Sequence, residues 1–190
     1  MISVDAAVLP TVAVPDLLGP EAEPQLSEPG VSTPATPDTD IAEPAEQPVV
    51  RAGSDLASMV ADLRSPDPGS RELDCLATGI YFESKGEPLA GQLAVGQVIA
   101  NRAESGGRFP PSYCGVLFQR GQFSFVRGHR LPPAPRSSRL WQTAVAIAKI
   151  VDQDLKESPV GNALFFHARY VSPGWRLKRV ASIGNHVFYR

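Results

Sequence analysis

The first 50 residues divide this chain into two unlike parts, and the division limits what can fold. They contain nine of the 19 prolines and nine Asp or Glu residues, but no Lys or Arg. A segment of this composition cannot bury enough apolar surface to offset the entropy lost on ordering it. We therefore expect residues 1–53 to form a disordered, acidic, extended tail that serves as a spacer or as a docking segment for a protein partner.

The rest of the chain is a basic domain. Residues 51–190 carry 18 Lys or Arg against 11 Asp or Glu, a net charge of +7, although the whole chain has a net charge of −2. About 140 residues suffice for one domain with its own core. We expect a short helix and a linker over residues 54–70, and the folded domain over residues 71–190. Its charge indicates an anionic partner, such as nucleic acid, a membrane surface or an acidic cell-wall polymer.

The sequence argues against several classes of protein. No run approaches the roughly 20 apolar residues of a membrane span, and the N-terminus has no recognisable secretion signal. The arginines are dispersed and no nucleic-acid-binding motif occurs, so we expect no nucleic acid partner. The three histidines, His129, His167 and His186, lack the spacing of a zinc site. We predict no metal and no cofactor.

Apolar spacing predicts the secondary structure. Helices are expected over residues 54–63, 71–85, 88–102 and 138–155, with a short helical turn over 113–119. A short strand is expected over residues 121–126. Short strands or loops are expected over 163–171 and 183–189, where aromatic and β-branched runs are broken by Gly and Pro. The predicted class is α+β, helical in the first half of the domain, with short strands and loops later.

Glu83 is the strongest catalytic candidate. At about 100° per residue, it lies about 20° from Leu76 around the predicted helix, at the edge of the apolar stripe. Partial burial and the negative end of the helix dipole both favour the protonated carboxyl and raise its pKa. A general acid that works near neutral pH needs such a pKa. The alternative is a solvated glutamate paired with Lys85 or Arg102.

Four motifs follow one another in a recognisable order. The first is IYFESKGEPLAGQLAVGQVIANR at 80–102; the others are FP with CGV and GQFS at 109–124, NALFFHA with YVSP at 162–173, and IGNHVFYR at 183–190. Together they closely resemble the SleB-like cell wall hydrolases, the spore-cortex-lytic enzyme family, over roughly residues 74–190.

The resemblance implies a lysozyme-like domain that cleaves peptidoglycan glycan strands between N-acetylmuramic acid and N-acetylglucosamine. The first glutamate of the family's Glu-x-x-Gly-Glu motif corresponds to Glu83, and in the family it is the acid/base of lytic transglycosylase chemistry. Such a mechanism forms a 1,6-anhydro product without a water nucleophile. It fits the lack of a second carboxylate in the motifs, since ordinary glycosidases use two.

Four further residues are candidates for binding the sugars. On a strand, Gln122 and Ser124 would face one side, where the resemblance suggests hydrogen bonds to N-acetyl and hydroxyl groups. The alternative is an ordinary half-buried strand. His167 and Tyr170 can share a face only where the strand bends, and we carry both as sugar-subsite candidates. Trp175 is a weaker candidate.

A peptidoglycan substrate implies a place in the cell envelope, periplasmic or otherwise extracytoplasmic, although this chain shows no export signal. In that compartment a disulfide between Cys75 and Cys114 is expected. It would tie the catalytic helix to the segment after Pro111. In an intracellular protein, free buried thiols would be the alternative.

Two other functions remain open from the sequence. One is an N-acetylmuramoyl-L-alanine amidase, which cuts between muramic acid and the peptide stem. The other is a non-catalytic peptidoglycan-binding or regulatory module that uses the basic domain to hold the anionic wall. The second predicts that Glu83→Gln leaves all function intact.

Overall fold

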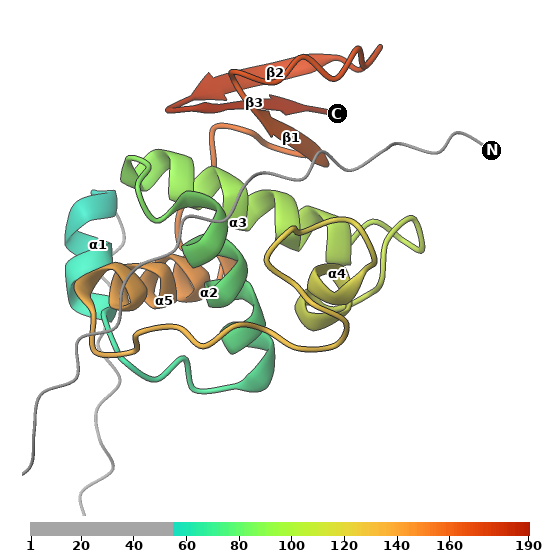
Figure 1. Cartoon of the computed structure of the whole chain (residues 1–190). Coiled ribbons are helices and arrows are strands. Elements are labelled where there is room, and N and C mark those ends of the chain that lie inside the picture. The colour runs from blue at the N-terminus through green and yellow to red at the C-terminus, as the bar shows by residue number, and fades with distance from the viewer. Residues whose placement is uncertain (1–54) are drawn as a thin grey trace, which may run out of the picture. The chain divides into compact units, whose positions relative to one another are not determined.

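The computed structural model describes residues 55–190, so the predicted acidic tail, residues 1–53, lies outside the described residues. Five helices come first and three short strands follow (Figure 1). The helices are α1 (Leu56–Leu63), α2 (Arg71–Ser84), α3 (Leu89–Ala103), α4 (Tyr113–Phe118) and α5 (Arg139–Asp152), and the strands are β1 (Phe165–Ala168), β2 (Arg179–Ile183) and β3 (His186–Tyr189). The predicted α+β class is confirmed.

Polar side chains at the N-termini explain where most of the helices begin. Asp55, Ser70, Ser112 and Ser138 each accept a hydrogen bond from a backbone N–H in the first turn of the helix that follows. Helix α3 is the exception, because Pro88 stands at its N-cap and has no side-chain group to donate or accept. The prediction had placed Pro88 inside this helix.

The helices enclose one apolar core. Its largest fully buried side chains include Trp141 of α5, Ile80 of α2 and Ile99 of α3. The indole N–H of Trp141 donates to the carbonyl of Pro66, 3.0 Å away, so its only polar group is satisfied. Helices α2 and α3 approach closely at Gly79, where a Cβ atom would lie 2.7 Å from Cδ1 of Ile99.

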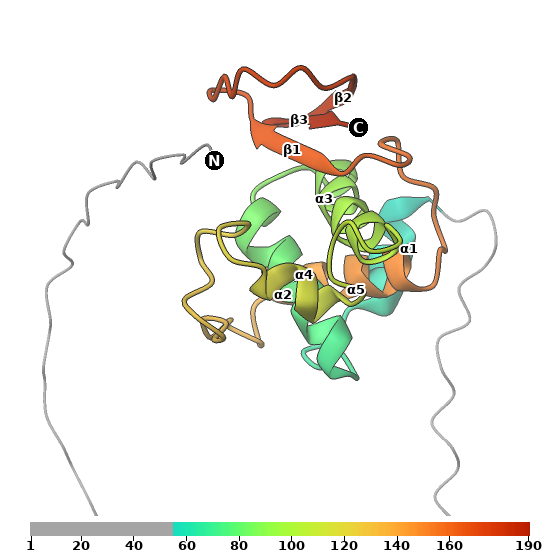
Figure 2. The same ribbon diagram turned by 90° about the vertical axis from the view of Figure 1, so that its right-hand side faces the viewer.

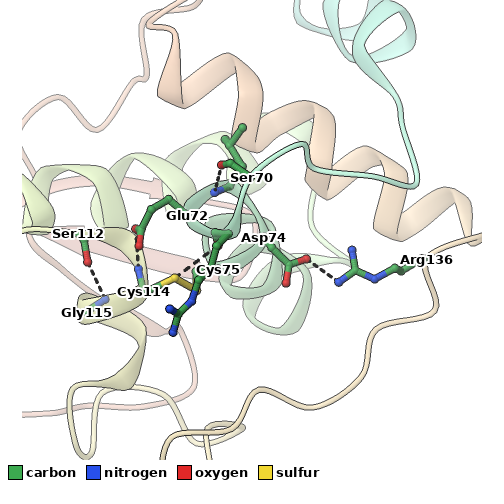
Figure 3. Close-up of a disulfide and its surroundings, with 10 residues drawn as sticks. Ser70, Glu72, Asp74, Cys75, Ser112, Cys114, Gly115 and Arg136 are labelled. Carbon is green, nitrogen blue, oxygen red and sulfur yellow. Dashed lines mark hydrogen bonds and ion pairs between the residues drawn. A yellow bond between two sulfur atoms is a disulfide. The ribbon is translucent and has the colours of Figure 1, made fainter.

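The start of α2 is tied to α4 and to the segment before α5. A disulfide joins Cys75 of α2 to Cys114 of α4, and the carboxylate of Glu72 accepts a hydrogen bond from the Cys114 backbone N–H (Figure 3). Asp74 forms an ion pair with Arg136, at 2.7 Å. These ties hold the N-terminal half of the helix that carries Glu83.

The strands form one antiparallel sheet in the order β1-β3-β2. Both views place this sheet beside α3, on one side of the helices (Figures 1 and 2). Asn101 of α3 donates two hydrogen bonds, to the carbonyls of Gly161 and Ala163, and Arg102 donates one to the carbonyl of Leu164. The C-terminal turn of α3 therefore holds the chain as it enters β1.

The strand predicted over residues 121–126 was wrong. Residues 121–126 form turns: the N–H of Gln122 donates to the carbonyl of Gln119, and that of Val126 to the carbonyl of Phe123. Phe123 is buried in the core and Phe125 stacks on Phe82, and the ring centres of Phe123 and Phe125 lie 5.6 Å apart although no strand carries them. The run at 183–189 contains the end of β2 and all of β3, and Gly184, which breaks the run, lies in the turn between the two strands.

Candidate active site

Glu83 lies in the last turn of α2 and lines a cavity of about 810 Å³, which we call the Glu83 cavity. The sheet and the loop that joins β1 to β2 provide most of its other lining residues. Of the described Asp and Glu residues, Glu83 alone lines it. The full lining is Glu83, Arg102, Gly121, Gln122, Phe165, Phe166, His167, Ala168, Tyr170, Val171, Pro173, Trp175, Arg176, Leu177 and His186.

The environment of Glu83 favours its protonated form. Burial raises the pKa of this carboxyl to about 7, and the positive charge of Arg102 holds it below the value that burial alone would give. Among the described residues, no Lys or Arg nitrogen lies within 4 Å of the Glu83 carboxylate. Lys85 instead places its ammonium 4.7 Å from the ring centre of Tyr81. The alternative of a solvated, ion-paired glutamate does not describe this environment.

Arg102 also lines the Glu83 cavity, and the sequence analysis named it only as a possible ion-pair partner of Glu83. It is 5% exposed, and its guanidinium carbon lies over the rings of Phe109 and Phe123, at 5.2 and 5.8 Å from their centres. Burial lowers its pKa to about 10, partly offset by Glu83, so it stays positive at neutral pH. Its position in the first motif was visible, but its burial beside Glu83 depends on how α2 and α3 pack.

His167 and Tyr170 line the Glu83 cavity together. β1 ends at Ala168 and a turn follows, which supplies the bend that the sequence analysis required. The Nδ1 of His167 lies 2.9 Å from the carbonyl of Ala168 and its Nε2 lies 2.9 Å from the hydroxyl of Tyr189. A carbonyl only accepts, so Nδ1 carries a proton; in a neutral ring Nε2 then accepts from the Tyr189 hydroxyl.

The remaining sequence candidates fall in two places. Gln122 lines the Glu83 cavity, while Ser124 lines a neighbouring groove and not this cavity. Trp175 lines the Glu83 cavity and packs edge-on against His167 and Tyr189. The exposed aromatic faces of Trp175 and Tyr170 offer apolar contact surface beside the polar groups.

Glu87 fixes the sheet against the helices. Its Oε2 atom accepts a hydrogen bond of 2.9 Å from the backbone N–H of Asn185, in the turn between β2 and β3. Its Oε1 atom lies 3.9 Å from Nδ1 of His186, whose pKa is lowered by burial. The preceding turn residue, Gly184, has φ +55°, and a Cβ there would collide with the Glu87 carboxylate. Glu87 is therefore a positioning residue for the far wall of the cavity.

Two further observations bear on metals and membranes. Within residues 55–190, no group of three or more His, Cys, Asp or Glu side chains is arranged to hold a metal ion. None of the helices in this range has both the length and the apolar character that a membrane crossing requires.

The sequence and the structure both match proteins that act on cell walls. The sequence profile of a family described as Cell Wall Hydrolase matches residues 86–189. Spore cortex-lytic enzymes of Bacillus cereus and Oceanobacillus iheyensis are 30% and 32% identical to this chain over 120 residues. The matched segment is 62% of this chain but only 43% and 41% of those relatives, so the chain spans less than half of their length.

Solved structures match at the level of the catalytic domain. The crystal structure of the catalytic domain of the Bacillus cereus SleB protein has a TM-score of 0.52 and 28% identity, and the match covers 67% of this chain and 98% of that domain. The catalytic domain of the germination-specific lytic transglycosylase SleB from Bacillus anthracis has the same TM-score and identity, over 66% of this chain and 100% of that domain.

Proposed function

This chain belongs to the Cell Wall Hydrolase family, and from that premise we propose that it cleaves the glycan strand of peptidoglycan between N-acetylmuramic acid and N-acetylglucosamine. We infer further that it does so as a lytic transglycosylase with Glu83 as the single acid/base. One observation carries the proposal: among residues 55–190, Glu83 is the one carboxyl group that lines the cavity, and its pKa is raised to about 7.

The mechanism needs one carboxyl group in two successive roles. Protonated Glu83 donates its proton to the glycosidic oxygen as the bond from that oxygen to C1 of muramic acid breaks. The Glu83 carboxylate then removes the proton from the 6-hydroxyl of the same sugar as the hydroxyl oxygen bonds to C1. The products are a 1,6-anhydro-muramic acid end and a free 4-hydroxyl on N-acetylglucosamine, and no water is consumed.

Arg102 supports the second role of Glu83. Once the proton has left, the buried Glu83 carboxylate would have a high free energy without a compensating positive charge nearby. The nearby guanidinium lowers that cost and keeps the pKa near 7, so both protonation states are accessible at neutral pH. We propose that Gln122, His167 and Tyr170 bind the sugar groups on either side of the scissile bond.

The disulfide and the proposed substrate both support a location outside the cytoplasm. Peptidoglycan lies outside the cytoplasmic membrane, and disulfides persist in oxidising compartments. The Cys75–Cys114 bond supports action in the cell envelope, periplasmic or otherwise extracytoplasmic.

Product analysis by mass spectrometry tests the proposal. Purified peptidoglycan is digested with the wild-type protein, with Glu83→Gln and with Glu157→Gln, a matched control at an exposed residue. Wild type and control are expected to release muropeptides that end in 1,6-anhydro-muramic acid, and Glu83→Gln to release none. Reducing-end sugars would contradict the single-residue mechanism and demand a water nucleophile.

Other products would assign another function. Free stem peptides, lost when a strong chelator is added, would make the protein a zinc-dependent amidase; we expect the activity to persist in chelator. No release by any of the three proteins, with binding to the wall retained, would favour a non-catalytic binding module.

A further inference from the structure

A second groove lies beside the Glu83 cavity and has no part in the mechanism above. Its volume is about 500 Å³, and we call it the arginine groove. Phe82 of its lining precedes Glu83 in α2, and Ser124 follows Gln122 by two residues, so the groove adjoins the cavity through both segments. Its lining is Phe82, Ser124, Phe125, Arg127, Arg130, Leu131 and Pro132.

Two arginines of the groove are held side by side. The N–H of Arg127 donates to the carbonyl of Arg130, and the N–H of Arg130 to the carbonyl of Arg127, at 3.3 and 3.2 Å. This tight turn includes Gly128, with φ +61°. Residues that face each other across an antiparallel bridge carry their side chains on the same face, and like charges in that position repel.

The described part of the chain supplies no counter-charge to this pair. Its ion pairs join Arg136 to Asp74 and His186 to Glu87, and none involves Arg127 or Arg130. Residues 105–151 contain no Asp or Glu at all. A ligand that brings an anion into the groove would relieve the repulsion between the two guanidinium groups.

The other wall of the groove is apolar. The rings of Phe82 and Phe125 stack with their centres 5.0 Å apart, and Leu131 packs beside the core. A ligand that fits both walls carries a carboxylate together with apolar groups, which a peptide can do and a neutral sugar cannot. The planar fork of a guanidinium is suited to two parallel hydrogen bonds to a carboxylate.

We propose that the arginine groove binds a free carboxylate of the peptide stem that muramic acid carries, so that this chain prefers peptide-bearing strands. A muramic lactam has condensed its carboxyl group into a ring amide and offers neither peptide nor carboxylate. The inference rests on the proposed function, because it assumes that a muramic acid residue occupies the Glu83 cavity.

Binding without turnover tests the inference. In a Glu83→Gln background, calorimetry measures the affinity for three soluble glycan fragments: one with acidic peptide stems, one with the stem carboxylates amidated and one without peptide. Arg127→Gln/Arg130→Gln is compared with Arg139→Gln/Lys156→Gln, which removes two positive charges from exposed residues that line neither cavity nor groove.

The groove variant is expected to bind the acidic fragment at least about tenfold more weakly, with little change for the other two fragments. The control variant is expected to bind all three as the parent does. Arg127→Lys/Arg130→Lys, which keeps the charge but not the planar fork, should give an intermediate loss. Thermal melting of each variant establishes that it is folded.

Several results would overturn the inference. They are an unchanged affinity for the acidic fragment, an equal loss for all three fragments, or no binding of the acidic fragment by the parent. Displacement of the acidic fragment by glycerol phosphate at a lower concentration than by acetate would assign the groove to a wall phosphate instead. The proposed function fails separately, if the wild-type protein binds the fragments and leaves their glycosidic bonds intact.

Discussion

At the scale of single residues, two opposing effects, burial and the charge of Arg102, set the pKa of Glu83, the proposed acid. Burial raises the pKa of the carboxyl, while the guanidinium lowers it, and the result is about 7. The two side chains come from different helices, and Arg102 is held in place by aromatic rings and by the carbonyl of Leu164. The pKa of the acid therefore depends on how α2, α3 and the start of the sheet pack together.

The activity should fall as the pH rises through about 7, because the first step requires protonated Glu83. In Arg102→Gln the favourable interaction with the carboxylate is lost, the pKa of Glu83 rises, and the fall in activity moves to higher pH. Arg102→Lys keeps the charge and should leave the fall near its original pH. The pH dependence of kcat/KM on a soluble glycan fragment measures both; an unmoved fall in Arg102→Gln would contradict the assigned interaction.

Replacing Glu83 should stabilise the protein at alkaline pH. The folded pKa of Glu83 is raised above its unfolded value, so its contribution to stability is fully present below about pH 4.5 and is lost as the pH rises through about 7. Glu83→Gln cannot ionise and should raise the free energy of unfolding by about 1–3 kcal/mol at pH 8, with little effect at pH 4. Urea unfolding at the two pH values checks this, with Glu157→Gln as the pH-independent control.

At the scale of secondary-structure elements, the cavity depends on the sheet being held against the helices. Asn101 and Arg102 hold the chain that leads into β1, and Glu87 holds the turn between β2 and β3. The cavity is thus closed by a few hydrogen bonds between elements far apart in the sequence. The wall that carries His186 is positioned from the loop before α3.

Gly184→Ala should loosen this wall. The substitution places a Cβ against the Glu87 carboxylate at a residue with φ +55°, so the turn must shift. We expect a loss of about 1–3 kcal/mol in the free energy of unfolding, a lower kcat/KM and faster amide hydrogen exchange at Asn185. Gly86→Ala is the matched control, because a Cβ there meets nothing within 4 Å. Equal effects of the two substitutions would contradict the role assigned to Glu87.

The helices were predictable because local signals determine them. Ser70 caps α2 in the structure, and the apolar stripe that predicted this helix also placed Glu83 at its edge. The turns at 121–126 were not predictable in the same way: Phe123 and Phe125 alternate with polar residues as in a strand, but no strand within residues 55–190 pairs with them. The role of Arg102 was also missed, since its burial follows from tertiary packing alone.

At the scale of the whole molecule, the disulfide links elements that are 39 residues apart in the chain. By the loop-entropy estimate, a crosslink over this separation stabilises the folded state by about 4 kcal/mol. Cys75→Ser/Cys114→Ser should lower the free energy of unfolding by up to that amount while the fold persists at low temperature. Urea unfolding of the variant and of the reduced wild-type protein checks this; an unchanged midpoint in both would contradict it.

The same disulfide also affects the direction in which the Glu83 side chain points. Cys75 and Glu83 are eight residues apart on one helix, about 12 Å along its axis. In a regular helix, the direction of each side chain around the axis is determined by its position in the sequence. If the sequence of α2 were shifted by one residue along the helix, the Glu83 carboxyl would rotate by about 100° about the helix axis, away from its present direction. The disulfide near the start of α2 fixes the rotation of this helix about its own axis. It thereby fixes the direction in which the Glu83 side chain points, more than two helical turns away.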